Sequence, residues 1–218
     1  VIMSPHIDAE TLDEYLPQTL PVVLLNCYVE SNGFDSLNID NFGGAYQMVK
    51  HLLGHGHKRI AIIQGIEKNF DAAERLRGYR FAMQENNGQL DPHLEIPGNF
   101  SEASGYDAVK HLLAIASRPT AIFACNDSMA IGALSALRDH GIQVPEEIAL
   151  TGFDDVPIAP YLTPSLTSVQ VGIHNLGVQA IETVLHAVRN KNAHRKQQVL
   201  LQTKLSLRQS CGCSNKLS

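Results

Sequence analysis

Hydrogen-bonding side chains follow two short apolar runs in the segment between residues 119 and 155. Asn126 and Asp127 come directly after the first run, and Asp154 and Asp155 come shortly after the second. In an open parallel α/β sheet, ligands bind outside the carboxyl ends of the strands. If both runs are strands of such a sheet, their carboxamide and carboxylate groups meet at one edge. The pattern predicts a pocket for a polar, uncharged small molecule.

Asp154 and Asn126 each have two interpretations from the local sequence. The Asp154 carboxylate can accept hydrogen bonds from two adjacent ligand hydroxyls, or it can cap a helix or a turn. The Asn126 carboxamide offers a ligand hydroxyl both a donor and an acceptor, or it caps the helix that begins beside it. Asp127 is able to supply that cap instead and leave Asn126 free. Asp155 is predicted to be a turn residue.

Arg75 lies in the first turn of a predicted helix, next to a polar loop at residues 65–71. Its planar guanidinium has five donors and can hold two ring hydroxyls at once. The competing interpretation is a surface arginine that pairs with Glu67, Asp71 or Glu74, because exposed ion pairs are common. The local sequence leaves both interpretations open.

Metal and catalytic chemistry find little support in the sequence. Cys211 and Cys213 are separated by one glycine, which is not a zinc pattern, and no paired Cys/His motif lies nearby in the chain. His51, His55 and His57 surround a predicted helix end, where an imidazolium complements the helix dipole. The sequence has no HExxH, GxSxG or glycine-rich phosphate loop followed by lysine. We therefore expect a protein that is not an enzyme and has neither a metal nor a cofactor.

Length and composition are typical of a globular protein. The 218 residues suffice for one large domain or two small ones. No apolar run reaches the roughly 18 residues of a membrane span, and the start VIMSP lacks the order of a secretion signal. The net charge of −5 argues against a surface that binds duplex DNA. Four scattered cysteines do not form a disulfide framework, so a reducing, cytoplasmic setting is expected.

Short apolar runs alternate with segments of helical periodicity along most of the chain. This order predicts parallel sheets covered by helices on both faces. Residues 161–164 and 168–171 are predicted to be an irregular crossing, because prolines precede them. The predicted strands are 22–25, 36–39, 59–64, 121–125, 148–151 and 198–203, and the predicted helices are 43–54, 72–87, 104–113, 128–140 and 175–189.

Several segments resemble, in order and at matching spacing, signatures of the effector-binding core of the lactose-repressor/galactose-repressor (LacI/GalR) family. The segments are IDNFGGAYQMVKHLLGHGHKRIAIIQG, ERLRGY, PTAIFACNDSMAIGAL, VPEEIALTGFDD and LTPSLTSV. The resemblance extends from residue 1 to about residue 210. It implies an α/β fold of the type I periplasmic-binding-protein kind, with two lobes that each contain a parallel sheet flanked by helices.

The resemblance also implies how the chain is divided between the lobes. Crossings between them are expected near Asp40, Gln170 and Val199, and they permit hinge closure over a ligand. The N-terminal lobe is expected to be incomplete, because family members carry a helix-turn-helix and a first portion of the core before the point that matches Val1. The expected ranges are 1–40 and 171–198 for the N-terminal lobe, 41–170 and 199–210 for the C-terminal lobe, and 211–218 for a tail.

Family members place ligand contacts at positions that match several residues of this chain. Phe100 matches an aromatic that lies against the ligand ring, although it is equally well explained as an ordinary loop anchor. Asn26 stands where the family often has aspartate, and this departure suggests a different pattern of ligand hydroxyls. Tyr28 and Phe153 are secondary candidates, and Phe153 is expected to be a core residue. The expected ligand contacts are Arg75, Asp154, Asn126, Phe100, Asn26, Phe70 and Asp71.

By resemblance, the chain is the ligand-sensing domain of a transcriptional regulator. The effector is expected to be a sugar or sugar derivative, because sugar-sensing members carry asparagine at the position of Asn126 and the purine-sensing repressor has glycine there. A nucleoside or purine is the second choice. Operator DNA would be bound through the N-terminal domain that this chain lacks, and a homodimer without membrane contact is expected. The alternatives are a sensor domain fused to a signalling enzyme, which the RQSCGC tail leaves open, and a periplasmic sugar-binding protein for transport.

Overall fold

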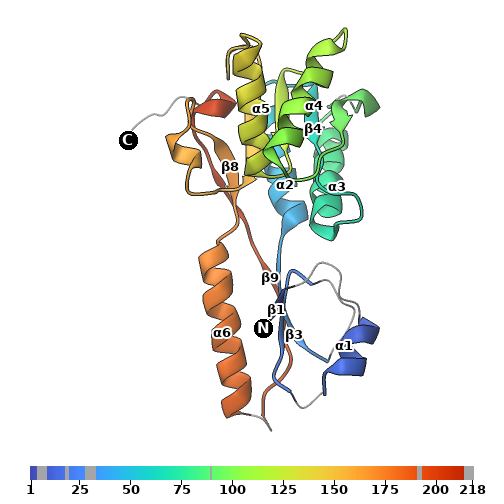
Figure 1. Ribbon diagram of the computed structural model, residues 1–218, viewed down its shortest axis with the longest axis vertical. Helices are drawn as coiled ribbons and strands as arrows, with labels where there is room; N and C mark the ends of the chain where they lie inside the picture. The colour runs from blue at the N-terminus through green and yellow to red at the C-terminus, as the bar shows by residue number, and fades with distance from the viewer. Residues whose placement is uncertain (4–8, 18–19, 28–32, 89, 191–192, 214–218) are drawn as a thin grey trace. The chain divides into compact units, whose positions relative to one another are not determined.

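The computed structural model describes residues 1–3, 9–17, 20–27, 33–88, 90–190 and 193–213. The chain divides into two compact units. Unit 1 comprises Val1–Asp40 and Gly172–Gln202, and unit 2 comprises Asn41–Val171 and the residues from Thr203 onward. Each unit has its own sheet and its own helices (Figure 1).

Unit 1 is built on a four-stranded sheet of order β1-β2-β3-β9, in which all neighbouring strands are parallel. Leu12, Leu24 and Phe34 belong to its buried core, which explains why the apolar run at residues 22–25 forms a strand. Asp35 is also buried, and its carboxylate pairs with His194 at 2.9 Å. The elements are β1 (Ile2–Met3), α1 (Ala9–Tyr15), β2 (Val23–Leu25), β3 (Asp35–Ile39), α6 (Ile173–Arg189) and β9 (Gln198–Leu201).

Unit 2 is built on a six-stranded sheet of order β10-β8-β7-β6-β4-β5. All its neighbours are parallel except β10, which runs antiparallel to β8. The strands are β4 (Ile60–Ile63), β5 (Glu95–Ile96), β6 (Ala121–Ala124), β7 (Ala149–Asp154), β8 (Thr167–Gln170) and β10 (Lys204–Ser206). The helices are α2 (Asn41–Gly54), α3 (Phe70–Glu85), α4 (Glu102–Ala114) and α5 (Asp127–Asp139), with short 3₁₀ turns η1 (Pro92–Leu94), η2 (Ala159–Tyr161) and η3 (Gln209–Cys211).

Helices cover both faces of the sheet in unit 2 (Figure 1). Helix α2 packs on α3, and α4 packs on α5. Right-handed crossovers between parallel strands place these two pairs on opposite faces. Every residue of β4 and β6 is therefore buried, as expected for central strands with uninterrupted apolar sequence.

Glycine permits the close contact between α4 and α5. A Cβ atom on Gly132 of α5 would lie 1.8 Å from the carbonyl oxygen of Glu102 in α4, and one on Gly105 of α4 would lie 2.0 Å from the carbonyl oxygen of Met129. Real Cβ atoms do not approach backbone so closely. The two helices can pack this closely only because each has a glycine at the contact, with a hydrogen atom where other residues have a Cβ.

The structure departs from the expected division at its C-terminal end. Residues 198–203 were expected to form one strand, with a crossing near Val199. Instead this run is divided at Gln202 and Thr203. The part before them, β9, pairs with β3 in unit 1, and the part after them, β10, pairs with β8 in unit 2.

One further expectation for this part of the chain is wrong. Residues 168–171 belong largely to strand β8 rather than to an irregular crossing. Ser210, just before the expected tail, is tied to the sheet: its hydroxyl donates to the Leu150 carbonyl at 2.6 Å and accepts from the Thr167 amide at 2.9 Å.

Among the described residues, no helix combines the length and the hydropathy that a membrane crossing requires.

Candidate functional site

The site lies in unit 2, at the carboxyl ends of the neighbouring strands β4, β6 and β7. Ligands of open α/β sheets bind at this edge. The loop after β4 leads into α3, the loop after β6 leads into α5, and β7 ends at Asp154. The sheet therefore brings together residues that are far apart in the sequence.

Arg75 is the centre of the site and is only 5% exposed. Its Nε donates to Asn41 Oδ1 at 2.7 Å, its Nη1 donates to the carbonyl oxygen of Cys125, and its Nη2 lies 3.4 Å from Asp154 Oδ1. The guanidinium carbon stacks 3.7 Å from the centre of the Phe153 ring. The interpretation as a surface arginine paired with exposed acids is therefore wrong, because the guanidinium is buried and held on several sides.

Two carboxylates flank this arginine. Asp71 accepts a hydrogen bond from Asn41 Nδ2 at 2.8 Å. Burial raises the pKa of Asp71, and Arg75 and the bond from Asn41 oppose this rise. Burial also raises the pKa of Asp154, which Arg75 lowers and Asp71 raises further. The Asp154 side chain is 38% exposed, so the carboxylate has a surface that a ligand can reach.

Asn126 caps helix α5, so of the two residues that the local sequence left open for this role it is Asn126 rather than Asp127. Asn126 Oδ1 accepts from the amide of Met129 at 2.9 Å, and its Nδ2 donates to the carbonyl oxygen of Phe100 at 3.0 Å. The side chain thus joins the start of α5 to the loop before α4. Both ends of the Asn126 carboxamide can make one more hydrogen bond, since Nδ2 has a second hydrogen and Oδ1 has a second lone pair.

Asp127 is a buried structural residue rather than a cap. Its Oδ1 accepts from the Ser168 hydroxyl at 2.6 Å, and its Oδ2 accepts from the Val156 amide at 2.8 Å. Burial raises the pKa of Asp127 to about 7, although both hydrogen bonds lower it. Asp155 has a similar structural role, because Arg208 Nη2 lies 2.7 Å from its Oδ1.

Phe100 is half-buried and has a positive φ of 67°. A Cβ atom on Gly65 would lie 2.2 Å from Cζ of the Phe100 ring, so the ring packs directly on the glycine backbone after β4. Phe70 is the first residue of α3 and is 45% exposed. The preceding residue, Asn69, caps that helix, because its Oδ1 accepts from the Ala72 amide at 2.9 Å. Phe153 is fully buried, as expected of a core residue.

Asn26 belongs to unit 1, whereas the other expected contacts belong to unit 2. It follows β2 with φ of 47°, and its Oδ1 accepts from the Ile39 amide at 3.3 Å. Its role as a ligand contact stays a prediction. Tyr28 lies outside the described residues.

Asn41 is a residue of this site that sequence reasoning missed. It is 1% exposed at the start of α2, and it bridges Arg75 and Asp71 through the two ends of its carboxamide. The signal was its place directly after Asp40, where a crossing between the lobes was expected. A pocket of about 500 Å³ also lies near the loop after β4, but none of the expected ligand contacts lines it.

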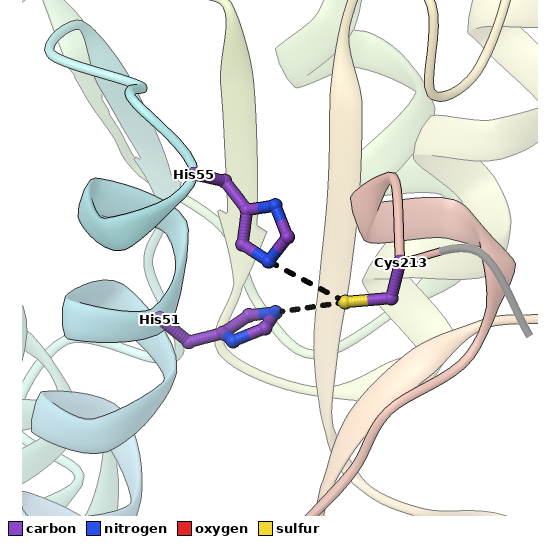
Figure 2. Close-up of side chains that lie close together, drawn as sticks. All are labelled: His51, His55 and Cys213. Carbon is purple, nitrogen blue, oxygen red and sulfur yellow. Dashed lines mark hydrogen bonds between the residues drawn. The ribbon is translucent and has the colours of Figure 1, made fainter. Parts of the chain in front are cut away.

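Unit 2 also contains a cluster of metal-ligating side chains that was not expected. Cys213 Sγ lies 3.4 Å from His51 Nε2 and 3.5 Å from His55 Nε2 (Figure 2). The sequence around Cys213 contains no paired Cys/His motif and so gave no sign of this cluster. The partners come from α2, far away in the sequence, where spacing alone gives no signal.

The family model of the periplasmic binding protein-like domain matches residues 49–211 of the chain. A regulatory protein of the LacI family from Chloroflexus aggregans has the same fold, with a TM-score of 0.83 and 34% sequence identity. The match covers 91% of this chain and 70% of that protein. The chain belongs to the LacI family.

Two further LacI-family comparisons bear on the ligand. The ribose operon repressor of Haemophilus influenzae is 34% identical over 188 residues, which are 86% of this chain and 57% of the repressor. A LacI-family transcriptional regulator from Enterococcus faecalis, solved with bound ribose, has a TM-score of 0.85 and 26% identity, covering 96% of this chain and 75% of that one. HTH-type transcriptional repressors are among the other relatives. The chain spans slightly more than half the length of the curated relatives it matches.

Proposed function

We propose that this chain is the effector-binding part of a LacI-type transcriptional regulator and that its effector is a sugar or sugar derivative. The observation that carries the proposal is the Arg75–Asp154 pair at the strand ends of unit 2. Its cation is buried and its carboxylate is partly exposed. The side chains of Arg75, Asp154, Asn126, Phe100, Phe70 and Asp71 in unit 2, and Asn26 in unit 1, are the proposed ligand contacts.

The charges of the pair favour a neutral ligand over an ionic one. The charges of Arg75 and Asp154 offset each other at 3.4 Å, so a charged ligand would find no unpaired opposite charge in this pair. A sugar hydroxyl can donate to the carboxylate and accept from a guanidinium N–H at the same time. Both bonds are charge-assisted and therefore stronger than bonds between neutral groups.

Phe100 and Asn126 support a sugar in particular. The ring of Phe100 packs on Gly65 and has a fixed orientation, and aromatic rings offer a flat apolar surface to the C–H faces of sugars. Asn126 holds the Phe100 loop through the carbonyl at 3.0 Å and keeps an unused donor and acceptor for a hydroxyl. The ribose-bound structure of the Enterococcus faecalis regulator supports a pentose as the first ligand to test.

In the full-length protein, effector binding would control operator binding by a helix-turn-helix domain outside this chain. A ligand changes such an equilibrium only through different affinity for the two states. We propose that the protein is a homodimer, since an operator with two half-sites matches a protein with two-fold symmetry. Helix α6 supports this, because Val178, Ile181, Leu185 and Val188 are exposed along one of its faces. We also propose that it works in the cytoplasm. We propose no catalytic activity, as the relatives are repressors by name.

Thermal shift and calorimetry with ribose, glucose, cellobiose and hypoxanthine test the ligand class. Bound ligand raises the melting temperature by mass action, and about 100-fold excess over Kd stabilises by roughly 2.7 kcal/mol. The Asp154→Asn variant should bind the sugar roughly 10- to 100-fold more weakly, since it loses a charge-assisted acceptor. Asp107→Asn, at an exposed aspartate of α4, is the matched control and should bind normally. Binding of hypoxanthine but of no sugar would overturn the proposal.

A further inference from the structure

Three metal-ligating side chains of unit 2 converge on one point, away from the residues of the Arg75 site. His51 is in the last turn of α2, and His55 follows one turn later, just beyond the end of the helix. Cys213 comes after η3 at the C-terminal end of the described chain. The ligand atoms His51 Nε2, His55 Nε2 and Cys213 Sγ all lie within 4.8 Å of one another (Figure 2).

The sulfur–nitrogen distances are those of a tetrahedral zinc site. Zinc binds thiolate sulfur at about 2.3 Å and imidazole nitrogen at about 2.0–2.1 Å, so sulfur and nitrogen ligands of one ion lie about 3.6 Å apart. The sulfur of Cys213 is 3.4 Å from His51 Nε2 and 3.5 Å from His55 Nε2. A thiol can donate to one imidazole and accept from the N–H of the other, so two hydrogen bonds can join the three side chains. A cation between the three atoms would replace both bonds by coordination.

We propose that His51, His55 and Cys213 bind one Zn²⁺ ion. The ligand types favour zinc over the hard cations Mg²⁺ and Ca²⁺, which prefer oxygen ligands. Three protein ligands leave the fourth position of the tetrahedron to water or to another ligand.

The site has a structural consequence within unit 2. It joins the end of α2 to the segment after η3, which are separated by more than 150 residues in the sequence. The unfolded chain does not hold residues so far apart in one place, so zinc binds the folded unit in preference to the unfolded chain. Zinc binding therefore adds directly to the folding free energy of unit 2.

Cobalt and zinc titrations of the full chain test the site. The chain is kept reduced, stripped of metal with a chelator, and titrated with Co²⁺, whose thiolate complexes give a charge-transfer band in the near ultraviolet. We expect the band to saturate at about one equivalent and Zn²⁺ to abolish it by displacement. Zn²⁺ should also raise the melting temperature of the stripped chain.

Two variants and one control show whether these residues are the ligands. His55→Ala and Cys213→Ser should each weaken metal binding by at least tenfold and lose the thermal shift. His55 is exposed and Cys213 is half-buried, so neither change removes a core contact, and each variant checks the other. His111→Ala is the control, since His111 is another exposed histidine in the last turn of a helix. It should behave like the unchanged chain.

The proposal fails if the stripped chain gives no thiolate-to-cobalt band at stoichiometric Co²⁺. It also fails if Cys213→Ser keeps the same band, or if His55→Ala and His111→Ala are stabilised equally by Zn²⁺. These results do not depend on the effector, so they are separate from the test of sugar binding.

Discussion

Replacing Arg75 with methionine should destabilise unit 2 strongly, because the guanidinium satisfies buried acceptors. Methionine keeps an unbranched apolar stem, but it loses the guanidinium that stacks on the Phe153 ring and has no donor. The change leaves Asn41 Oδ1 and the Cys125 carbonyl without the bonds that Arg75 now provides. A buried acceptor without a donor costs about 1–3 kcal/mol, so two such acceptors cost about 2–6 kcal/mol. Asp154 adds little, since it is 38% exposed and water can solvate it.

Urea denaturation followed by circular dichroism measures this loss. The free energy of unfolding should fall by the stated amount while the m-value stays constant. Arg77→Met is the matched control on the same helix, because Arg77 is 61% exposed and pairs with Glu74 one turn away. An exposed pair of this kind is worth about 1 kcal/mol at most. If both variants lose the same stability, the contacts of Arg75 contribute no more than a surface ion pair, and the reasoning is refuted.

Three further predictions concern other parts of unit 2. Gly132→Ala should destabilise by at least about 2 kcal/mol in urea melts, because its Cβ would lie 1.8 Å from the Glu102 carbonyl oxygen; a smaller loss would mean that α4 and α5 separate easily. Gly65→Ala should displace the Phe100 ring and weaken sugar binding in calorimetry, since the new Cβ would lie 2.2 Å from that ring; unchanged affinity would remove Phe100 from the site. Burial raises the pKa of Asp127 to about 7, above its unfolded value of about 3.9, so the native state holds this proton more tightly. Stability should therefore fall as the pH rises from about 4 to about 7, and Asp127→Asn should flatten this decline; melts with equal slopes for both proteins would contradict it.

The sequence was sufficient to predict the alternation of strands and helices, because central strands such as β4 and β6 are continuous apolar runs. It was insufficient at the C-terminal end, where apolar pattern cannot show that β9 and β10 pair with different sheets. Strand β8 was missed because the prolines before it obscure a short strand whose pairing with β7 is long-range.

The sequence suggested individual candidate residues for the site, but not the side chains that they contact. The resemblance pointed to Arg75 and Asp154 separately, whereas their direct contact depends on the order of β4, β6 and β7 in the sheet. Asn126 and Asp127 are both able to cap α5, and local sequence cannot choose between them. The choice is decided by distant groups, since the Ser168 hydroxyl engages Asp127.

The metal-ligating cluster shows the same limit more clearly. His51 and His55 have a spacing that places them on one side of a helix, but Cys213 is far from them along the chain. No motif with fixed spacing contains all three residues. Only the packing of η3 and its neighbours in unit 2 reveals that they meet.

The two bonds of Asn126 affect how such a protein can acquire a new ligand during evolution. One substitution at this position would alter the proposed ligand contact, remove the cap of α5 and release the loop at Phe100 together. A change of specificity at Asn126 is thus tied to a loss of stability that other mutations must first offset. Phe70 is 45% exposed and caps no helix, so it can vary at lower cost. We expect duplicated copies of this gene to diverge in ligand preference first at positions like Phe70.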